Sequence, residues 1–105
     1  MEEMDIEEAR KLVSSNKTRF VWLGGEPRID MAEALGIGKD RFTVMRPDAV
    51  YHADRALAES LSKSVLVCPH GNSSLFLAQH LMEEFNVEVY SLHGGISAIV
   101  GENNY

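Results

Sequence analysis

Cys68 is the residue whose type and position point most directly to chemistry. It is the only cysteine among 105 residues, and it directly follows the apolar run Val65-Leu66-Val67. The segment after it, Pro69-His70-Gly71-Asn72-Ser73-Ser74, is rich in small residues and hydrogen-bond donors. A single cysteine forms no intramolecular disulfide, so Cys68 is either an inert core residue or a reactive thiol. Because a core cysteine needs no donor-rich loop after it, the sequence favours a reactive thiol.

The loop from Cys68 to Ser74 has the composition of an anion-binding turn. Gly71 can take a positive φ, which a turn that aims several N–H groups at one point often requires. Ser73 and Ser74 can cap the following helix and donate hydroxyl hydrogen bonds into the loop. The positive end of that helix dipole also favours negative charge. We therefore expect the loop to stabilise a thiolate.

The elements around this loop alternate between helical and strand periodicity, which predicts an α/β domain. Helices are expected over residues 6–13, 30–35, 47–60, 75–85 and 96–100, and strands over 19–23, 42–45, 65–67 and 87–92. The apolar strand 65–67 is typical of a parallel strand covered by helices on both faces. The expected fold is a three-layer α/β/α domain with a central, mainly parallel sheet. Cys68 would then lie at the carboxyl end of a buried strand, where such sheets bind ligands.

Length and charge exclude several other classes of function. We expect residues 1–105 to form a single domain, since the length suits one core. The formal net charge of −6, with no basic run, argues against nucleic acid as a partner. The acidic start and the lack of a long apolar stretch argue against a secretory signal and a membrane span, so we expect a cytoplasmic protein. The four dispersed histidines and one cysteine give no metal-ligand spacing.

Two motifs together resemble the rhodanese-like family. The first is the apolar strand that ends in Cys68, with Gly71 and small hydroxyl residues before a helix. The second is residues 89–96, Val-Tyr-Ser-Leu-His-Gly-Gly-Ile, which fits the family's strand followed by Gly-Gly-Ile. The loop looks most like that of the short single-domain bacterial thiosulfate sulfurtransferases. Either motif alone would be a weak signal, but both at this spacing are fairly specific.

The resemblance implies a rhodanese-like domain that acts as a sulfurtransferase. Cys68 would be the catalytic residue, taking a sulfane sulfur from thiosulfate or a persulfide and passing it, as a Cys68 persulfide, to a nucleophilic acceptor. The implied substrate-binding loop comprises Pro69, His70, Gly71, Asn72, Ser73 and Ser74. The implied partners are a small-molecule sulfur donor and acceptor, or a sulfur-carrying partner protein. No cofactor or metal is implied.

Differences from the family keep another function open. Many members carry Asp-x-Arg after the first strand and Gly-His-Ile further on, where this chain has Leu23-Gly24-Gly25 and Ile37-Gly38-Lys39-Asp40. The tryptophan usual after Gly-Gly-Ile is also missing. A catalytically weak or inactive rhodanese-like module that binds a partner protein is the alternative that these differences favour.

Other cysteine-loop enzymes fit the sequence less well. A phosphatase or arsenate reductase needs an arginine at the end of the loop to clamp the oxyanion, where this chain has Ser73 and Ser74. A class-B phosphotransferase component usually carries its cysteine on the first strand of its domain. For His70 we favour a solvated loop position over contact with substrate. For Phe76, off the apolar stripe of its helix, we favour packing against a neighbouring element over a place in the wall of the site.

Overall fold

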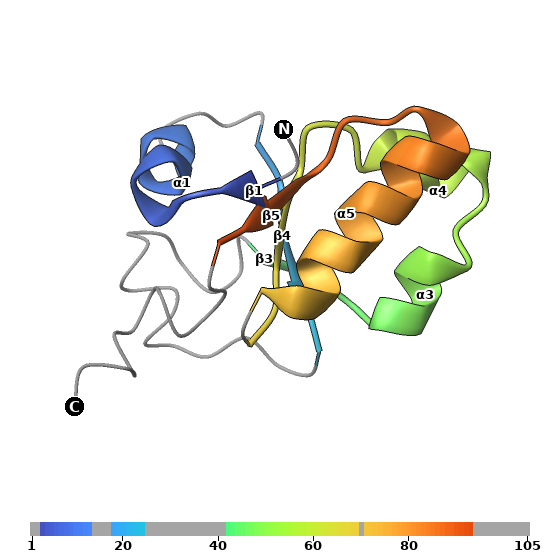
Figure 1. Cartoon of the computed structure of the whole chain (residues 1–105), viewed down its shortest axis with the longest axis horizontal. Coiled ribbons are helices and arrows are strands. Elements are labelled where there is room, and N and C mark those ends of the chain that lie inside the picture. The colour runs from blue at the N-terminus through green and yellow to red at the C-terminus, as the bar shows by residue number, and fades with distance from the viewer. Residues whose placement is uncertain (1–2, 14–17, 25–41, 70, 94–105) are drawn as a thin grey trace.

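The apolar runs of the sequence form one parallel sheet in the computed structural model, which describes residues 3–13, 18–24, 42–69 and 71–93 (Figure 1). The strands within these ranges are β1 (Glu3–Met4), β2 (Phe20–Leu23), β3 (Phe42–Met45), β4 (Val65–Val67) and β5 (Tyr90–Leu92). Their order in the sheet is β1-β5-β4-β2-β3, and every neighbouring pair is parallel. Strand β4 is therefore central, with β5 on one side and β2 on the other.

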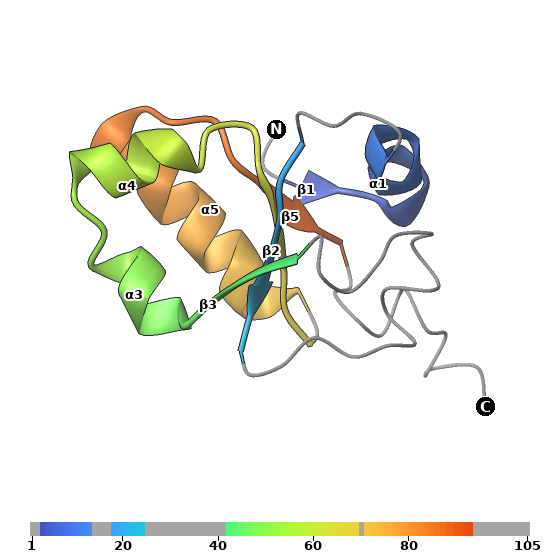
Figure 2. The ribbon, with the colours of Figure 1, turned by 180° about the vertical axis from the view of Figure 1, so that it is seen from behind.

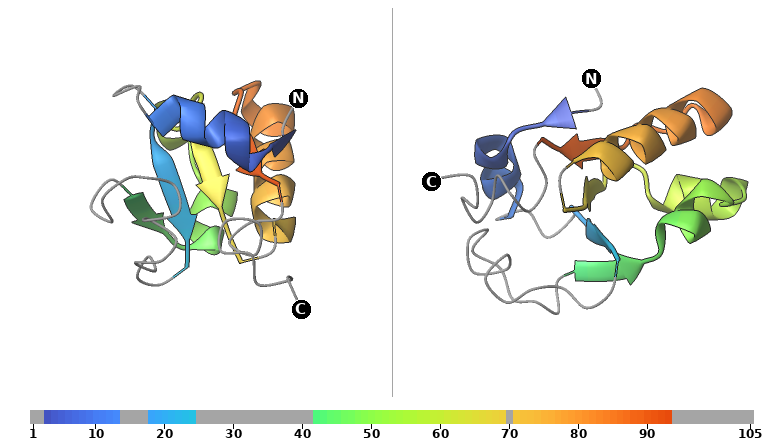
Figure 3. Two further views of the ribbon diagram at one scale, coloured as in Figure 1. Left: turned by 90° about the vertical axis from the view of Figure 1, so that its left-hand side faces the viewer. Right: turned by 60° about the horizontal axis from the view of Figure 1, so that its bottom comes forward.

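Helices cover both faces of this sheet. Helix α1 (Ile6–Val13) lies on one face, and α3 (Pro47–Tyr51), α4 (Arg55–Ser60) and α5 (Asn72–Phe85) lie on the other (Figure 2). The two further views show the same three layers (Figure 3). The expected three-layer α/β/α architecture is thus confirmed. Within the part of the chain that the structure describes, no helix is both long enough and apolar enough to cross a membrane.

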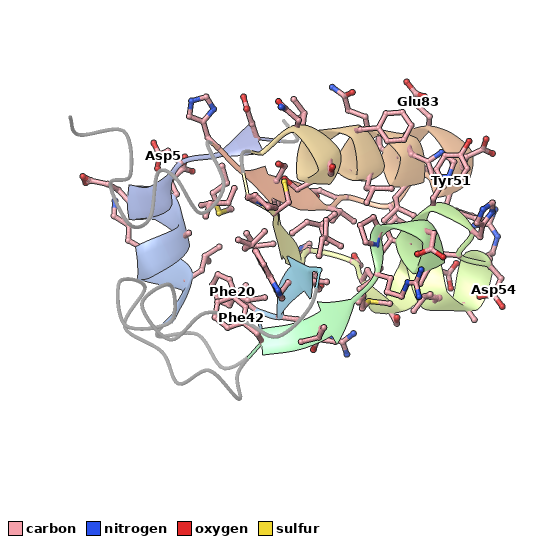
Figure 4. The ribbon with its side chains drawn as sticks, turned by 90° about the horizontal axis from the view of Figure 1, so that it is seen from below. Asp5, Phe20, Phe42, Tyr51, Asp54 and Glu83 are labelled. Carbon is pink, nitrogen blue, oxygen red and sulfur yellow. The ribbon has the colours of Figure 1, made fainter. Side chains whose placement is uncertain are left out.

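Strand alternation divides the core into two layers. In β2, Phe20 and Trp22 face α1, whereas Val21 and Leu23 face the opposite helices. Phe20 meets Phe42 of β3 edge to face, with ring centroids 6.1 Å apart (Figure 4). Because helices cover both faces of the sheet, β2 has no polar side, and its sequence is a continuous apolar run.

The central strand fixes the position of the cysteine. All three residues of β4 are fully buried, and Leu66 pairs in register with Val21 on one side and Ser91 on the other. Leu66 and Cys68 are two residues apart, so both side chains belong to the core layer under α5. Cys68 therefore lies at the carboxyl end of β4, beneath the start of α5.

The helix expected over residues 47–60 is two helices, α3 and α4. The chain between them is extended at Asp54, whose φ is −83° and ψ 178°. The Asp54 Oδ1 accepts a hydrogen bond of 2.9 Å from the backbone N–H of Leu57. Aspartate favours this N-cap role over a helix interior, because its short side chain competes for backbone N–H groups. A similar cap at Asp5, on the N–H of Glu8, confirms the predicted start of α1.

Strand limits also differ from the expectation. The strand expected over residues 87–92 forms ladder pairs only at Tyr90–Leu92, and residues 87–89 lead into it with Val87 and Val89 buried in the core. Strand β1 was not predicted, because two residues carry no periodicity; its pairing with β5 defines it. The helices expected over 30–35 and 96–100 lie outside the described residues. Strands 19–23, 42–45 and 65–67 are confirmed to within one residue.

Replacing Asp54 by alanine is expected to lower the free energy of unfolding by about 1 kcal/mol, the typical cost of a lost N-cap. The side chain is exposed and lies at the N-cap of α4, outside the loop that follows Cys68, so no site property should change. Urea unfolding followed by circular dichroism measures the effect. An unchanged unfolding midpoint would contradict the assigned cap.

Candidate functional site

The sulfur of Cys68 is surrounded by hydrogen-bonding groups although its side chain is buried. Cys68 is 2% exposed and directly follows β4. Its Sγ accepts hydrogen bonds from the backbone N–H of Gly71 at 3.1 Å and of Ser74 at 3.4 Å. The Ser74 Oγ lies 3.3 Å from the same sulfur. These contacts are what an anionic sulfur requires in a buried position, because they replace hydration that burial removes.

The sulfur also occupies the capping position of helix α5. Gly71 is the N-cap residue and has no side chain to offer, while Ser74 is the third residue of the helix. The N–H at this position normally bonds to the N-cap side chain, and here Cys68 Sγ accepts it instead. The sulfur therefore sits at the positive end of a 14-residue helix.

Gly71 has the conformation that the loop requires. Its φ is +87° and its ψ −3°, in the left-handed region. A residue with a Cβ would pay a steric cost there of about 1–2 kcal/mol. This conformation turns the Gly71 N–H back toward Cys68, so the expectation of a positive φ at this glycine is confirmed.

A hydroxyl chain extends from the sulfur into the core. Ser74 Oγ lies 2.6 Å from the Ser91 Oγ on β5, and both serines are fully buried. As a thiol, Cys68 donates its proton to Ser74 Oγ. When the sulfur is anionic, the Ser74 hydroxyl can rotate to donate to it while Ser91 donates to Ser74. The pair can therefore satisfy both protonation states of the sulfur without moving a heavy atom.

Sequence reasoning missed Ser91 as a part of the site. The residue alternates with Tyr90 and Leu92 on a strand whose neighbours toward the N-terminus, Val87 and Val89, are apolar. A polar residue in phase with buried valines marks a side chain that needs a buried partner. That signal was present in the sequence, but the identity of the partner depends on β5 lying next to β4.

The other loop residues that the structure describes form the rim of the site. Cys68, Pro69, Asn72 and Ser73 line a hollow of about 150 Å³ beside the sulfur. Pro69, Asn72 and Ser73 are exposed, and Ser73 therefore lies at the rim instead of capping the helix as expected. His70 lies outside the described residues. In the described part of the chain, no three His, Cys, Asp or Glu side chains come together as a metal site.

Tyr90 carries a shifted pKa but lies on the other face of the sheet. Its hydroxyl donates a hydrogen bond to the carboxylate of Glu88. That hydrogen bond, with smaller contributions from burial and from the Glu88 charge, raises the pKa of Tyr90 above its usual value of 10.0. Tyr90 packs against the core layer under α1, whereas the adjacent Ser91 faces the sulfur. Tyr90 therefore has no part in the site.

Replacing Ser74 by alanine is expected to slow the reaction of Cys68 with a sulfane-sulfur donor about tenfold, because one donor to the anionic sulfur is lost. It should also lower the free energy of unfolding by about 1–3 kcal/mol, since the buried Ser91 hydroxyl loses its partner. Reactions quenched at a series of times and analysed by intact-mass spectrometry give the rate of sulfur uptake. Urea unfolding gives the free energy of unfolding. Asp54→Ala is the matched control, with a comparable stability loss and an unchanged rate. Equal rates in Ser74→Ala and the control would contradict the role of the hydroxyl.

Comparison with known proteins identifies the fold. No family model and no curated protein matches the chain. The chain is similar in structure to a rhodanese-related protein from Thermoplasma volcanium, known from a crystal structure. The TM-score is 0.66 over 97% of this chain and 93% of that chain, at 13% sequence identity. The fold is rhodanese-like. At this identity the likeness establishes the architecture alone.

Within this rhodanese-like fold, the structure places two of the other loop residues, Gly71 and Ser74, against the sulfur of Cys68. Ser91 contacts Ser74 from β5. Pro69, Asn72 and Ser73 border the adjacent hollow. The groups around the Cys68 sulfur are positioned by three features: the apolar strand β4, the positive φ of Gly71 and the start of α5.

Proposed function

We propose that this protein is a sulfurtransferase that carries a sulfane sulfur on Cys68. The observation that carries the proposal is the polar surroundings of Cys68 Sγ at the start of a helix: two backbone N–H groups donate to it at 3.1 and 3.4 Å, and the Ser74 Oγ lies at 3.3 Å. Such surroundings favour a negatively charged sulfur, which is the nucleophilic form of cysteine. A nucleophilic cysteine can hold the transferred sulfur covalently, and this divides one transfer into two steps. The rhodanese-like fold supports this assignment. We propose a cytoplasmic setting, where thiols stay reduced.

The first step forms the persulfide. The Cys68 thiolate attacks the sulfane sulfur of the donor, a new S–S bond forms, and the bond between that sulfur and the rest of the donor breaks. The leaving group departs with the bonding electron pair, as sulfite from thiosulfate or as a thiolate from a persulfide. The loop has no Lys or Arg between Pro69 and Ser74. We therefore expect a persulfide donor to react faster than the thiosulfate dianion.

The second step returns the enzyme to its starting state. A nucleophilic acceptor attacks the outer sulfur of the Cys68 persulfide, and the inner S–S bond breaks. The electron pair returns to Cys68, whose thiolate is received again by Gly71, Ser74 and the helix start. No net oxidation or reduction of the protein takes place, so the proposed cycle requires neither metal nor cofactor.

One observation favours the alternative of a non-catalytic, partner-binding module. Cys68 is only 2% exposed, and among the described residues the opening beside its sulfur is the hollow bordered by Pro69, Asn72 and Ser73. Sulfur uptake distinguishes the two functions, because a module that serves only to bind a partner would leave Cys68 unmodified.

Treatment of the purified protein with a low-molecular-weight persulfide is expected to add the mass of one sulfur atom. The reason is that the thiolate is the attacking form of the cysteine, and the N–H groups of Gly71 and Ser74 stabilise it. Intact-mass spectrometry measures the gain, peptide mapping locates it, and cyanide should remove it. An aryl phosphate, tested in parallel, should not be turned over. Failure to gain sulfur from either a persulfide or thiosulfate would favour the binding module.

A further inference from the structure

A second cavity adjoins the hollow at Cys68 and has aromatic walls. Its volume is about 420 Å³, within the range of small-molecule sites. The described residues that line it are Pro47, Asp48, Tyr51, Asn72, Ser73, Phe76 and Leu77. Phe76 is 57% and Tyr51 44% exposed, and large aromatic side chains so exposed to solvent often mark a binding surface. Phe76 packs against a neighbouring element, the Tyr51 ring of α3, as expected, and it also lines this cavity. We call this cavity the aromatic groove.

The aromatic wall is held in place by contacts between α3 and α5. The rings of Tyr51 and Phe76 stack with centroids 6.0 Å apart and an interplanar angle of 14°. The His80 ring stacks on Tyr51 at 4.5 Å, and its Nε2 makes a 3.0 Å hydrogen bond with the Tyr51 carbonyl. Figure 4 shows Tyr51 beside α5. Because these rings are already ordered, a flat apolar ligand would find a prepared surface.

Charge on the groove argues for an uncharged ligand. Asp48 is the one charged side chain among the described lining residues, and Arg46 Nε donates a 3.1 Å hydrogen bond to its carboxylate. An anion would find no unpaired cation there, and the net charge of −6 adds repulsion. The rings of Tyr51 and Phe76 instead offer faces for an aromatic group.

The groove and the hollow at Cys68 are adjacent, because Asn72 and Ser73 line both. A molecule can therefore place its apolar group against Phe76 and its sulfur beside Cys68. Resting on the proposed sulfur transfer, we propose that the acceptor is an uncharged thiol bearing an aromatic or bulky apolar group. The bound thiol first loses its proton to solvent. The resulting thiolate attacks the outer sulfur of the Cys68 persulfide, the bond between the two persulfide sulfurs breaks, and an organic persulfide leaves while the electron pair returns to Cys68 as its thiolate.

Single-turnover transfer from sulfur-loaded protein tests this acceptor class. The protein is loaded with a persulfide donor, freed of excess donor, and mixed with benzyl mercaptan or with 2-mercaptoethanol, which is small and polar. Intact mass follows the loss of sulfur. Phe76→Ala is expected to lower the rate constant with benzyl mercaptan about tenfold, because a stacking face is removed, and to change that with 2-mercaptoethanol less than about twofold. Gln79→Ala, an exposed change on the same helix outside the groove, is the matched control.

Comparing each variant with wild type for one acceptor at a time cancels differences in acceptor acidity. An equal effect of Phe76→Ala on both acceptors, or no effect on either, would overturn the proposal. Binding of benzyl methyl sulfide, followed by NMR shifts in wild type and Phe76→Ala, gives a readout independent of chemistry. If no sulfur loads but this ligand binds the wild type and not the variant, sulfur transfer is wrong and the ligand class stands. If it does not bind the wild type, the ligand class is wrong.

Discussion

Replacing Cys68 by serine is expected to abolish sulfur transfer while leaving the fold intact. The hydroxyl of serine is a poor nucleophile without an adjacent base, and the hydroxyls of Ser74 and Ser91 do not act as one. Oxygen also cannot hold a transferred sulfur as a persulfide. We expect transfer to cyanide or a thiol to fall by at least about 10³-fold, as for loss of a covalent nucleophile in other enzymes.

The fold should tolerate this change because the serine oxygen finds the same partners as the sulfur. The N–H groups of Gly71 and Ser74 can donate to it, so no buried donor is left unpaired. The free energy of unfolding should change by less than about 1 kcal/mol. Steady-state assays of sulfur transfer and urea unfolding of the same preparation separate chemistry from stability. A folded Cys68→Ser variant that still transferred sulfur would show that the reaction does not pass through residue 68.

Replacing Leu66 by alanine is expected to be the most destabilising of the single changes considered. The side chain is fully buried in the central strand and packs in the core layer under α5, so truncation leaves a cavity closed on all sides. Such substitutions cost about 2–5 kcal/mol, a large part of the stability of a domain of this size. Urea unfolding measures the loss as a lower midpoint with an unchanged slope.

The control for Leu66→Ala is a second core variant that removes a smaller volume. Val67→Ala, on the other face of β4, removes fewer atoms and should cost less than Leu66→Ala. Leu66 shares its core layer with Cys68, and so Leu66→Ala should also slow sulfur uptake more than Val67→Ala. The reverse order in either stability or uptake would contradict the packing described for the central strand.

Local signals in the sequence were sufficient for the elements that position the cysteine. The unbroken apolar run before Cys68 predicted a strand buried on both faces, and the cap at Asp5 predicted the start of α1. The donor-rich composition after Cys68 predicted a loop that turns N–H groups toward the sulfur, and Gly71 was singled out for its positive φ. Each of these features depends on residues close together along the chain.

Features that depend on distant residues were missed. The Ser74–Ser91 contact joins residues 17 positions apart, and only the pairing of β4 with β5 brings them together. The aromatic groove depends on the contact between Tyr51 of α3 and Phe76 of α5, which are 25 positions apart in the sequence. The break at Asp54 was overlooked because apolar periodicity continues across it, and the capping preference of aspartate outweighs that periodicity.

The capping of α5 by the sulfur of Cys68 means that the covalent state of one atom and the order of a helix are thermodynamically linked. Whatever bonds to that sulfur alters how well it accepts the N–H groups of Gly71 and Ser74, and so alters the free energy of local opening at the first turn. A partner protein that reads the shape of this turn would therefore distinguish loaded from unloaded protein without touching the sulfur.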